Sequence, residues 1–190
     1  MICTKQDLKK CIDADRIANG ADDKKVFRRN SIRDLSYSRY LLNCIVRLRK
    51  YEYKKNRFSQ RKNIFTFFGY VLYKLYYNAK CKSTGIFIAP GVFKEGLRLV
   101  HPGYRWISQT AQIGKNCTIL PDVFVGQKHP GEKQPCVFIG DNCYIGVRTT
   151  ILGPIRIGNN VTIGGGSVVV KDLPDNCVAA GNPAKIIKIK

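Results

Sequence analysis

The stretch GLRLVHPG, residues 96–103, contains one of only two histidines among the 190 residues of this chain. An imidazole titrates near neutral pH, so His101 has the chemistry to take a proton from an alcohol that then acts as a nucleophile. A histidine directly ahead of Pro102 and Gly103 is also an ordinary turn residue. The elements that position His101 decide between these two interpretations.

Beyond about residue 85, Ile or Val recurs every six residues. A three-sided coil with one short strand on each side produces this period, because every sixth residue then points inward at the same place. A 3.6-residue helix or a two-residue strand alternation does not. The period predicts a parallel β-helix, and its ten positions, interrupted once, are Ile107, Ile113, Ile119, Val125, Ile139, Ile145, Ile151, Ile157, Ile163 and Val169.

A second column stands four residues after the first and is also small or apolar. We expect it to fill the corners of the coils, which makes Cys117 and Cys143 structural residues. Gly and polar residues follow the Ile in IGKN, IGDN and IGNN, as is typical of turns. The second column contains Ala111, Cys117, Val123, Cys143, Thr149, Ile155, Val161, Ser167 and Leu173.

The part of the chain before the repeats is strongly basic and helical in pattern. Residues 1–80 hold 20 Lys and Arg against 7 Asp and Glu, whereas residues 81–190 hold 13 against 6. Ser31 and Asp34 predict a capping box ahead of a helix that runs to about Arg57. The helix would have a basic face opposite an apolar stripe that includes Ile32, Leu35, Leu42, Ile45 and Val46.

Residues 64–77 are aromatic or aliphatic almost throughout. They are too few to span a bilayer, which takes about 20 residues. Two interpretations stay open: a helix buried against the protein or a neighbouring subunit, or a helix lying on a membrane surface. The flanking basic residues that favour the second are Arg57, Arg61, Lys62 and Lys80.

The eight cysteines form no CxxC pair, and two histidines do not complete a usual Cys/His zinc site. We therefore expect reduced, mostly buried thiols and no metal. The first residues, MICTKQDLKKC, carry charges where a secretory signal needs an apolar core. We expect a cytoplasmic protein, with the inner membrane surface as the alternative location.

Residues 163–188, IGGGSVVVKDLPDNCVAAGNPAKIIK, resemble the last coil and tail of the hexapeptide-repeat acyltransferases. The resemblance implies a mainly β fold, a left-handed parallel β-helix that assembles as a homotrimer. IAPGVFKEGLRLVH followed by ILPDVFVG is similar to the serine acetyltransferase branch, which has a catalytic histidine in the place of His101. That branch also has an N-terminal helical domain, so we expect a basic helical region at 1–82 and the β-helix at 83–190.

The chain departs from this branch at three polar positions. Phe87 replaces a carboxylate that orients the catalytic histidine, Val100 replaces an acidic residue, and Gln134 stands for a second active-site histidine. These groups help to recognise the amino acid. The acceptor is therefore L-serine or another hydroxyl compound, such as a cell-surface saccharide.

The resemblance implies direct acetyl transfer from acetyl-CoA, with His101 as general base and an oxyanion held by backbone N–H groups near Gly126 or Gln127. For the lysines of the tail, a solvated surface is the alternative to phosphate binding. By position, the residues implied to contact the cofactor are Gly126, Gly146, Val147, Gly165, Val170, Lys171, Lys185 and Lys188.

His129 lies in GQKHPGEKQP, which interrupts the repeats. In the family such a loop borders the active site of an adjacent subunit, so His129 and Gln134 are candidates to contact the acceptor. A solvated loop histidine is the alternative.

A different class of function also fits the composition. A non-catalytic β-helix could dock on anionic membrane through its basic helices. Nucleic acid is a weaker candidate partner, because no recognised motif is present and charge alone gives only salt-sensitive association.

Overall fold

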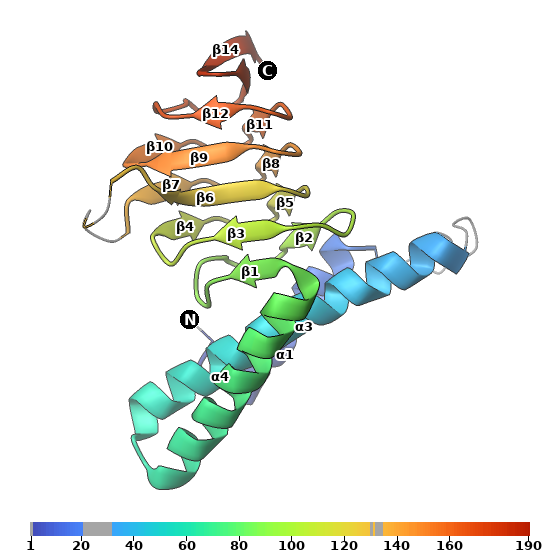
Figure 1. Cartoon of the computed structure of the whole chain (residues 1–190), viewed down its shortest axis with the longest axis vertical. Coiled ribbons are helices and arrows are strands. Elements are labelled where there is room, and N and C mark those ends of the chain that lie inside the picture. Colours follow the sequence, from blue (N-terminus) through green and yellow to red (C-terminus); the bar gives the residue numbers. More distant parts are fainter. Residues whose placement is uncertain (1, 21–31, 130, 132–134) are drawn as a thin grey trace.

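The computed structural model describes residues 2–20, 32–129, 131 and 135–190. Figure 1 shows the helices gathered at one end of a stack of β-coils, with the C-terminus at the other end. The fold is the predicted left-handed parallel β-helix with an N-terminal helical extension.

The described helices are α1 (Lys5–Ala18), α3 (Ile32–Arg61) and α4 (Ile64–Thr84). Thr4 and Asp7 form a capping box at the start of α1. The capping box predicted from Ser31 cannot be placed, because Ser31 lies outside the described residues. Helix α3 extends to Arg61 rather than ending near Arg57, since residues 54–60 contain no Gly or Pro to stop it.

Helices α3 and α4 form a hairpin joined by aromatic stacking. The ring centroids of Tyr51 and Tyr77 are 4.8 Å apart, and those of Phe58 and Tyr70 are 5.5 Å apart. The other face of α4 is exposed in this chain, and Phe65 is 84% exposed. Within the described residues, no helix has the length and apolar character needed to cross a membrane.

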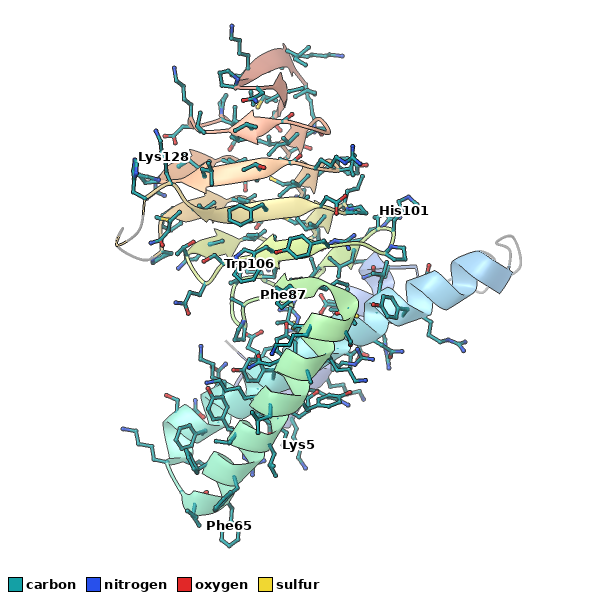
Figure 2. All side chains as sticks on the ribbon, viewed as in Figure 1. Lys5, Phe65, Phe87, His101, Trp106 and Lys128 are labelled. Carbon is teal, nitrogen blue, oxygen red and sulfur yellow. The ribbon has the colours of Figure 1, made fainter. Side chains whose placement is uncertain are left out.

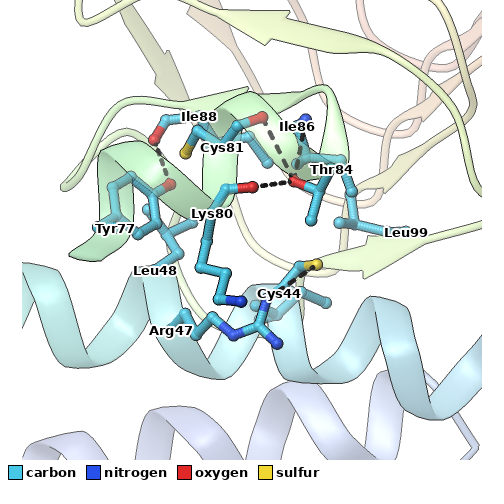
Figure 3. Close-up of a pocket in the computed structure, with 11 residues that line it drawn as sticks. Cys44, Arg47, Leu48, Tyr77, Lys80, Cys81, Thr84, Ile86, Ile88 and Leu99 are labelled. Atoms are coloured by element: carbon cyan, nitrogen blue, oxygen red, sulfur yellow. Dashed lines mark hydrogen bonds between the residues drawn. The ribbon is translucent and has the colours of Figure 1, made fainter. Parts of the chain in front are cut away.

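The C-terminal half of α4 joins the hairpin to the first coil (Figure 3). The Tyr77 hydroxyl donates a hydrogen bond to the Ile88 carbonyl at 2.7 Å. Cys44 and Leu48 of α3 line the same junction together with Ile86 and Leu99 of the coil. Gly85, with φ +70°, ends α4 directly before the first strand.

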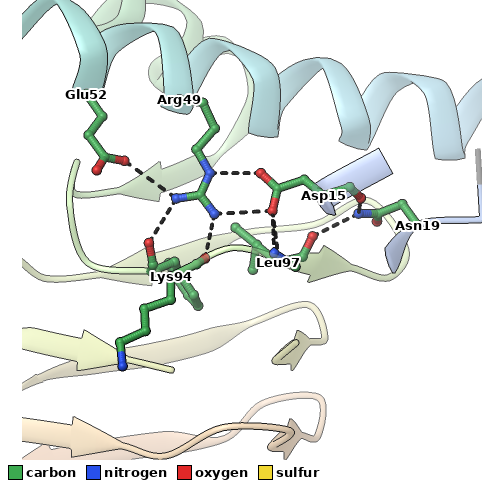
Figure 4. Close-up of polar contacts among 8 residues, drawn as sticks. Asp15, Asn19, Arg49, Glu52, Lys94 and Leu97 are labelled. Carbon is green, nitrogen blue, oxygen red and sulfur yellow. Dashed lines mark hydrogen bonds and ion pairs between the residues drawn. The ribbon is translucent and has the colours of Figure 1, made fainter. Parts of the chain in front are cut away.

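A polar anchor buried beneath α3 makes a second junction (Figure 4). Arg49 Nε donates to Asp15 Oδ2 at 2.8 Å, and Arg49 Nη1 donates to the Phe93 carbonyl at 2.9 Å. Asp15 Oδ1 accepts from the backbone N–H groups of Gly96 and Leu97, both at 2.9 Å. One ion pair therefore ties α1 and α3 to the strand segment that leads into the His101 turn.

The β-helix has three faces, and the coil strands within each face are parallel. The first face runs β1 (Ile86–Ile88), β3 (Arg105–Ile107), β6 (Val123–Gln127), β9 (Thr150–Gly153) and β12 (Val168–Val169). The second runs β4 (Ala111–Ile113), β7 (Val137–Ile139) and β10 (Ile155–Ile157). The third runs β2 (Arg98–Leu99), β5 (Thr118–Ile119), β8 (Tyr144–Ile145), β11 (Thr162–Ile163), β13 (Cys177–Gly181) and the antiparallel β14 (Ala184–Ile189).

The two predicted columns form the core of these coils. All ten residues of the first column are at most 4% exposed, and all nine of the second are at most 5% exposed. Six of the eight cysteines are buried, Cys117 and Cys143 among them. The prediction of mostly buried cysteines is confirmed: Cys117 and Cys143 occupy corner positions of the repeat, whereas Cys44 and Cys81 lie in α3 and α4.

Candidate active site

His101 lies in the turn between β2 and β3 and is exposed. Leu99 pairs with Ile119 and Ile107 pairs with Val125, so this turn spans eight residues from one core position to the next instead of six. His101 has φ +58°, a left-handed conformation in which histidine is enriched among non-glycine residues. The two additional residues push the turn outward and present the imidazole to solvent.

Arg105 holds this turn from the inside. Its side chain is fully buried, and Nη2 donates to the carbonyls of Val100 and His101, the latter at 2.8 Å. Nη1 donates to the Gly103 carbonyl at 3.1 Å. Burial lowers the pKa of the Arg105 guanidinium to about 10, so the group keeps its charge at neutral pH.

The turns after β2, β5, β8 and β11 lie above one another, because Leu99, Ile119, Ile145 and Ile163 pair in register. We call this corner of the β-helix the His101 edge. Backbone hydrogen bonds link its turns: Asp122 N–H to Tyr104 O, Arg148 N–H to Pro121 O, and Gly166 N–H to Val147 O. Gly146, Val147 and Gly165 therefore follow His101 along one edge, in the third and fourth turns.

The glycines of the His101 edge have a structural reason as well as a chemical one. A Cβ on Gly146 would lie 2.6 Å from the backbone nitrogen of Gly165 and 2.7 Å from the Ile163 carbonyl oxygen. A Cβ on Gly165 would lie 3.1 Å from Val147 Cγ1. Glycine at these positions therefore lets the turns stack closely, with Gly146 buried and Gly165 exposed.

A second corner, the Lys171 edge, consists of the turns after β3, β6, β9 and β12. It carries His129 and Lys171, which are exposed, and Val170, which is half-buried. Figure 2 shows Lys128 and His101 on opposite sides of the first face. One chain therefore does not bring His129, Val170 or Lys171 to His101, and Gln134 lies outside the described residues.

The remaining predicted site residues lie toward the ends of the faces. Gly126 is buried near the end of β6, four residues after Asp122 of the His101 edge, which is about 13 Å along a strand. Gln127 ends the same strand. Lys185 and Lys188 are exposed on β14, opposite Ala180 and Val178 of the last coil.

An aromatic face, Phe87, Tyr104, Trp106 and Phe124, lies over strands β1, β3 and β6 of the first face. Trp106 pairs with Phe87 on one side and Phe124 on the other, and the Phe87 and Trp106 ring centroids are 5.3 Å apart. Trp106 is 40% exposed and Tyr104 is 46% exposed. A groove of about 700 Å³ between α4 and this face is lined by Phe87 and Trp106, with polar groups from Asn78, Lys82, Ser108 and Gln109.

Sequence reasoning missed Arg105 and the aromatic face. Arg105 stands two residues before Ile107, in the second column, where an arginine conflicts with the apolar pattern. That conflict was the available signal. The aromatic face had a weaker signal, because the outward direction of Trp106 follows from strand alternation but its partners depend on coil register.

Comparison with known proteins agrees with the β-helix fold. A family model described as bacterial transferase hexapeptide (six repeats) matches residues 136–171. Serine acetyltransferase 2 of Arabidopsis thaliana is 41% identical over 108 residues, which cover 55% of this chain and 33% of that protein. The chain carries a hexapeptide-repeat fold and is similar in sequence to serine acetyltransferases.

The likeness extends over the helical part of the fold. The structure of Neisseria gonorrhoeae serine acetyltransferase in complex with serine is 28% identical, with a TM-score of 0.68, and the match covers 97% of this chain and 70% of that one. The serine acetyltransferase of Synechococcus elongatus is 36% identical over 107 residues, covering 55% of this chain and 43% of that protein. The chain thus spans less than half the length of the Arabidopsis and Synechococcus proteins.

Proposed function

We propose that the protein is an acetyl-CoA-dependent O-acetyltransferase with His101 as general base. The observation that carries the proposal is the exposed His101 at the start of an edge whose later turns carry the exposed residues Val147 and Gly165. The similarity to named serine acetyltransferases supports the same reaction class.

The proposed reaction needs no reactant beyond the two substrates, and His101 handles the proton. The imidazole of His101 removes the acceptor's hydroxyl proton as the oxygen attacks the acetyl carbonyl carbon. The carbon–sulfur bond then breaks, and the imidazolium returns the proton to the leaving thiolate. Gly146, Val147 and Gly165 would flank the pantetheine arm, and Lys185 and Lys188 would approach the phosphates as cations.

We propose that the working unit is a homotrimer. His101 lies on one edge, whereas His129, Val170 and Lys171 lie on the other. Rotational symmetry brings unlike edges of neighbouring subunits together, which would complete the site between two chains.

We propose a saccharide rather than L-serine as the acceptor. L-serine is zwitterionic at neutral pH, so its recognition needs charged partners, whereas the positions of Phe87 and Val100 are apolar. Exposed aromatic rings flanked by a few polar groups suit a ligand with both apolar faces and hydroxyls. The names of the relatives make L-serine the second candidate.

The test of this function is CoA release from acetyl-CoA, followed with a thiol reagent, with L-serine, simple sugars and oligosaccharides offered separately. Turnover with at least one hydroxyl compound supports the transferase, and the preferred compound decides the acceptor class. Acetyl-CoA binding without CoA release for any acceptor would contradict the proposal and favour the non-catalytic binding protein.

Trp106→Ala should raise KM for the acceptor about 10-fold and leave KM for acetyl-CoA within about 2-fold, because the ring supplies contact area to only one substrate. Steady-state kinetics with each substrate varied in turn measures both constants. Phe138→Ala, on the second face of the β-helix, is the matched control. Equal increases in both KM values would show that the aromatic face does not select the acceptor.

We also propose that the tip of the α3–α4 hairpin rests on an anionic membrane. Figure 2 shows Phe65 at the end of the hairpin farthest from the β-helix. Phe68 and Leu72 are 57% and 66% exposed, and Arg61 and Lys62 are exposed beside them. Apolar side chains flanked by cations match the chemistry of an anionic interface.

The hairpin proposal predicts co-sedimentation with vesicles that contain anionic lipid, falling as salt rises. Arg61→Gln with Lys62→Gln should abolish most of this binding, because each cation near the surface contributes about 1 kcal/mol. Lys9→Gln with Lys10→Gln, on the exposed surface of α1, is the control with the same charge change. Equal loss in both double variants would point to general charge rather than to the hairpin.

A further inference from the structure

Arg105 occupies a core position that its neighbours fill with aliphatic side chains. It pairs in register with Ile86 on one side and Val123 on the other, and both are buried. Within the described part of the chain, no ion pair involves Arg105. A buried guanidinium without a carboxylate partner opposes folding unless its donors are satisfied in another way.

The His101 turn satisfies the two terminal nitrogens of the guanidinium, whereas Nε has no hydrogen-bond partner within the described residues. The guanidinium donates to the carbonyls of Val100, His101 and Gly103, and it lies 3.4 Å from the Ile119 carbonyl oxygen of the next coil. Three of these four acceptors lie within residues 100–103. The side chain therefore replaces, for this turn, the water that would otherwise solvate its carbonyls.

Later turns of the His101 edge use smaller versions of the same arrangement. Thr149 Oγ1 donates to the Gly146 carbonyl at 2.8 Å, and Ser167 Oγ donates to the Gly164 carbonyl at 2.6 Å. Those turns have six-residue spacing, and one hydroxyl reaches the single carbonyl. The His101 turn is two residues longer, and it takes the length and several donors of an arginine to reach its carbonyls.

We propose that Arg105 is a positioning residue that holds the His101 turn in the geometry needed for proton abstraction. This inference rests on the proposed transferase function. Arg105 is fully buried, so it acts through the backbone of residues 100–103 and not on a substrate. Its planar fork of donors matters as well as its charge, because several carbonyls must be held at fixed angles.

The expected effect is on kcat rather than on binding. A displacement of about 1 Å in a catalytic group can cost about 100-fold in rate. Arg105→Met keeps an unbranched stem in the core and removes every donor, so we expect kcat to fall about 10- to 100-fold with KM for acetyl-CoA within about 3-fold. Arg105→Lys keeps a positive charge but lacks the planar fork of donors. Its kcat should lie between that of Arg105→Met and that of the natural protein.

Val123→Ala is the matched control, because Val123 is the in-register neighbour of Arg105 and its side chain has no hydrogen-bond donor for the turn carbonyls. It should lower the unfolding temperature through a core cavity and leave kcat within about 2-fold. A fall in kcat for Val123→Ala as large as that for Arg105→Met, at equal loss of stability, would overturn the inference.

The experiment combines kinetics with NMR of the protein labelled with ¹⁵N-histidine. Only two imidazoles give signals, and His101→Ala assigns them. In Arg105→Met we expect the His101 signals to shift or broaden and the His129 signals to stay unchanged. In Val123→Ala we expect the signals of both histidines to stay unchanged. Unchanged His101 signals, or kcat within about 2-fold of the natural protein, would overturn the inference.

The experiment also separates a failure of the proposed function from a failure of the role of Arg105. If the natural protein transfers no acetyl group to any acceptor, the proposed function fails, and NMR still decides whether Arg105 holds the turn. If Arg105→Met does not fold, Arg105→Lys provides the same two readouts, and full activity with natural His101 signals in that variant would overturn the role of the fork.

Discussion

His101→Ala should lower kcat for acetyl transfer about 100- to 10,000-fold, the usual range for removal of a general base. The binding of acetyl-CoA should change little, because the imidazole is at one end of the edge and the proposed cofactor contacts lie in its later turns. CoA release gives kcat, and isothermal titration with acetyl-CoA gives the affinity. Added imidazole should restore part of the rate in the variant if the missing group acts as a base.

His129→Ala is the control for this prediction, since it removes the other histidine from an exposed loop on the Lys171 edge. We expect a smaller effect, confined to KM for the acceptor if the loop contacts a neighbouring site. Equal kcat for His101→Ala and the natural protein would remove His101 from the mechanism. A large loss in both variants that imidazole does not restore would indicate a structural cause.

Arg49→Met should lower the free energy of unfolding by about 3–5 kcal/mol, the cost of leaving one partner of a buried ion pair without the other. Arg49 and Asp15 are 1% and 0% exposed, and Asp15 also accepts two backbone N–H groups of the first coil. After the substitution the Asp15 carboxylate is buried without its counter-ion. Urea unfolding followed by circular dichroism measures the change.

An exposed ion pair on α1, the helix that carries Asp15, is the control. Arg16 and Asp13 are 3.5 Å apart and about half exposed, so Asp13→Asn should cost at most about 1 kcal/mol. Asp15→Asn should resemble Arg49→Met, and the double variant should cost less than the sum of the two single changes, because the charges are coupled. Additive effects of Arg49→Met and Asp15→Asn would show that the anchor does not act as a pair.

Much of the β-helix could be predicted because its signal is local and repeated. Each Ile or Val of the first column marks the same inward position, so the pattern of Ile139 to Val169 alone identifies the coil. The end of α3 was less predictable: the helix continues to Arg61 because nothing in residues 54–60 stops it, and Lys62 ends it with φ +47°. The candidate base was predictable too, since His101 is one of two histidines and stands in a recognisable stretch.

The arrangement of the candidate site was not predictable in the same way. His101 and Gly165 share one edge, while Lys171 lies on the other, and this division follows from where each coil turns. The anchor depends on a contact between Asp15 and Leu97, which are 82 residues apart, and no local pattern reports such a contact. The role of Arg105 depends on carbonyls that only the folded turn brings around its side chain.

The amino-acid sequence by itself determined the β-helix and its two core columns, because periodic burial of apolar side chains is a property of neighbouring residues. It also pointed to His101, in the first coils, as the candidate base. Only the tertiary structure decided which corners carry the residues proposed to contact the cofactor, how the helices are tied to the first coil and what holds the His101 turn. These features arise from hydrogen bonds and ion pairs between groups far apart in the chain, whose partners exist only once the coils have stacked.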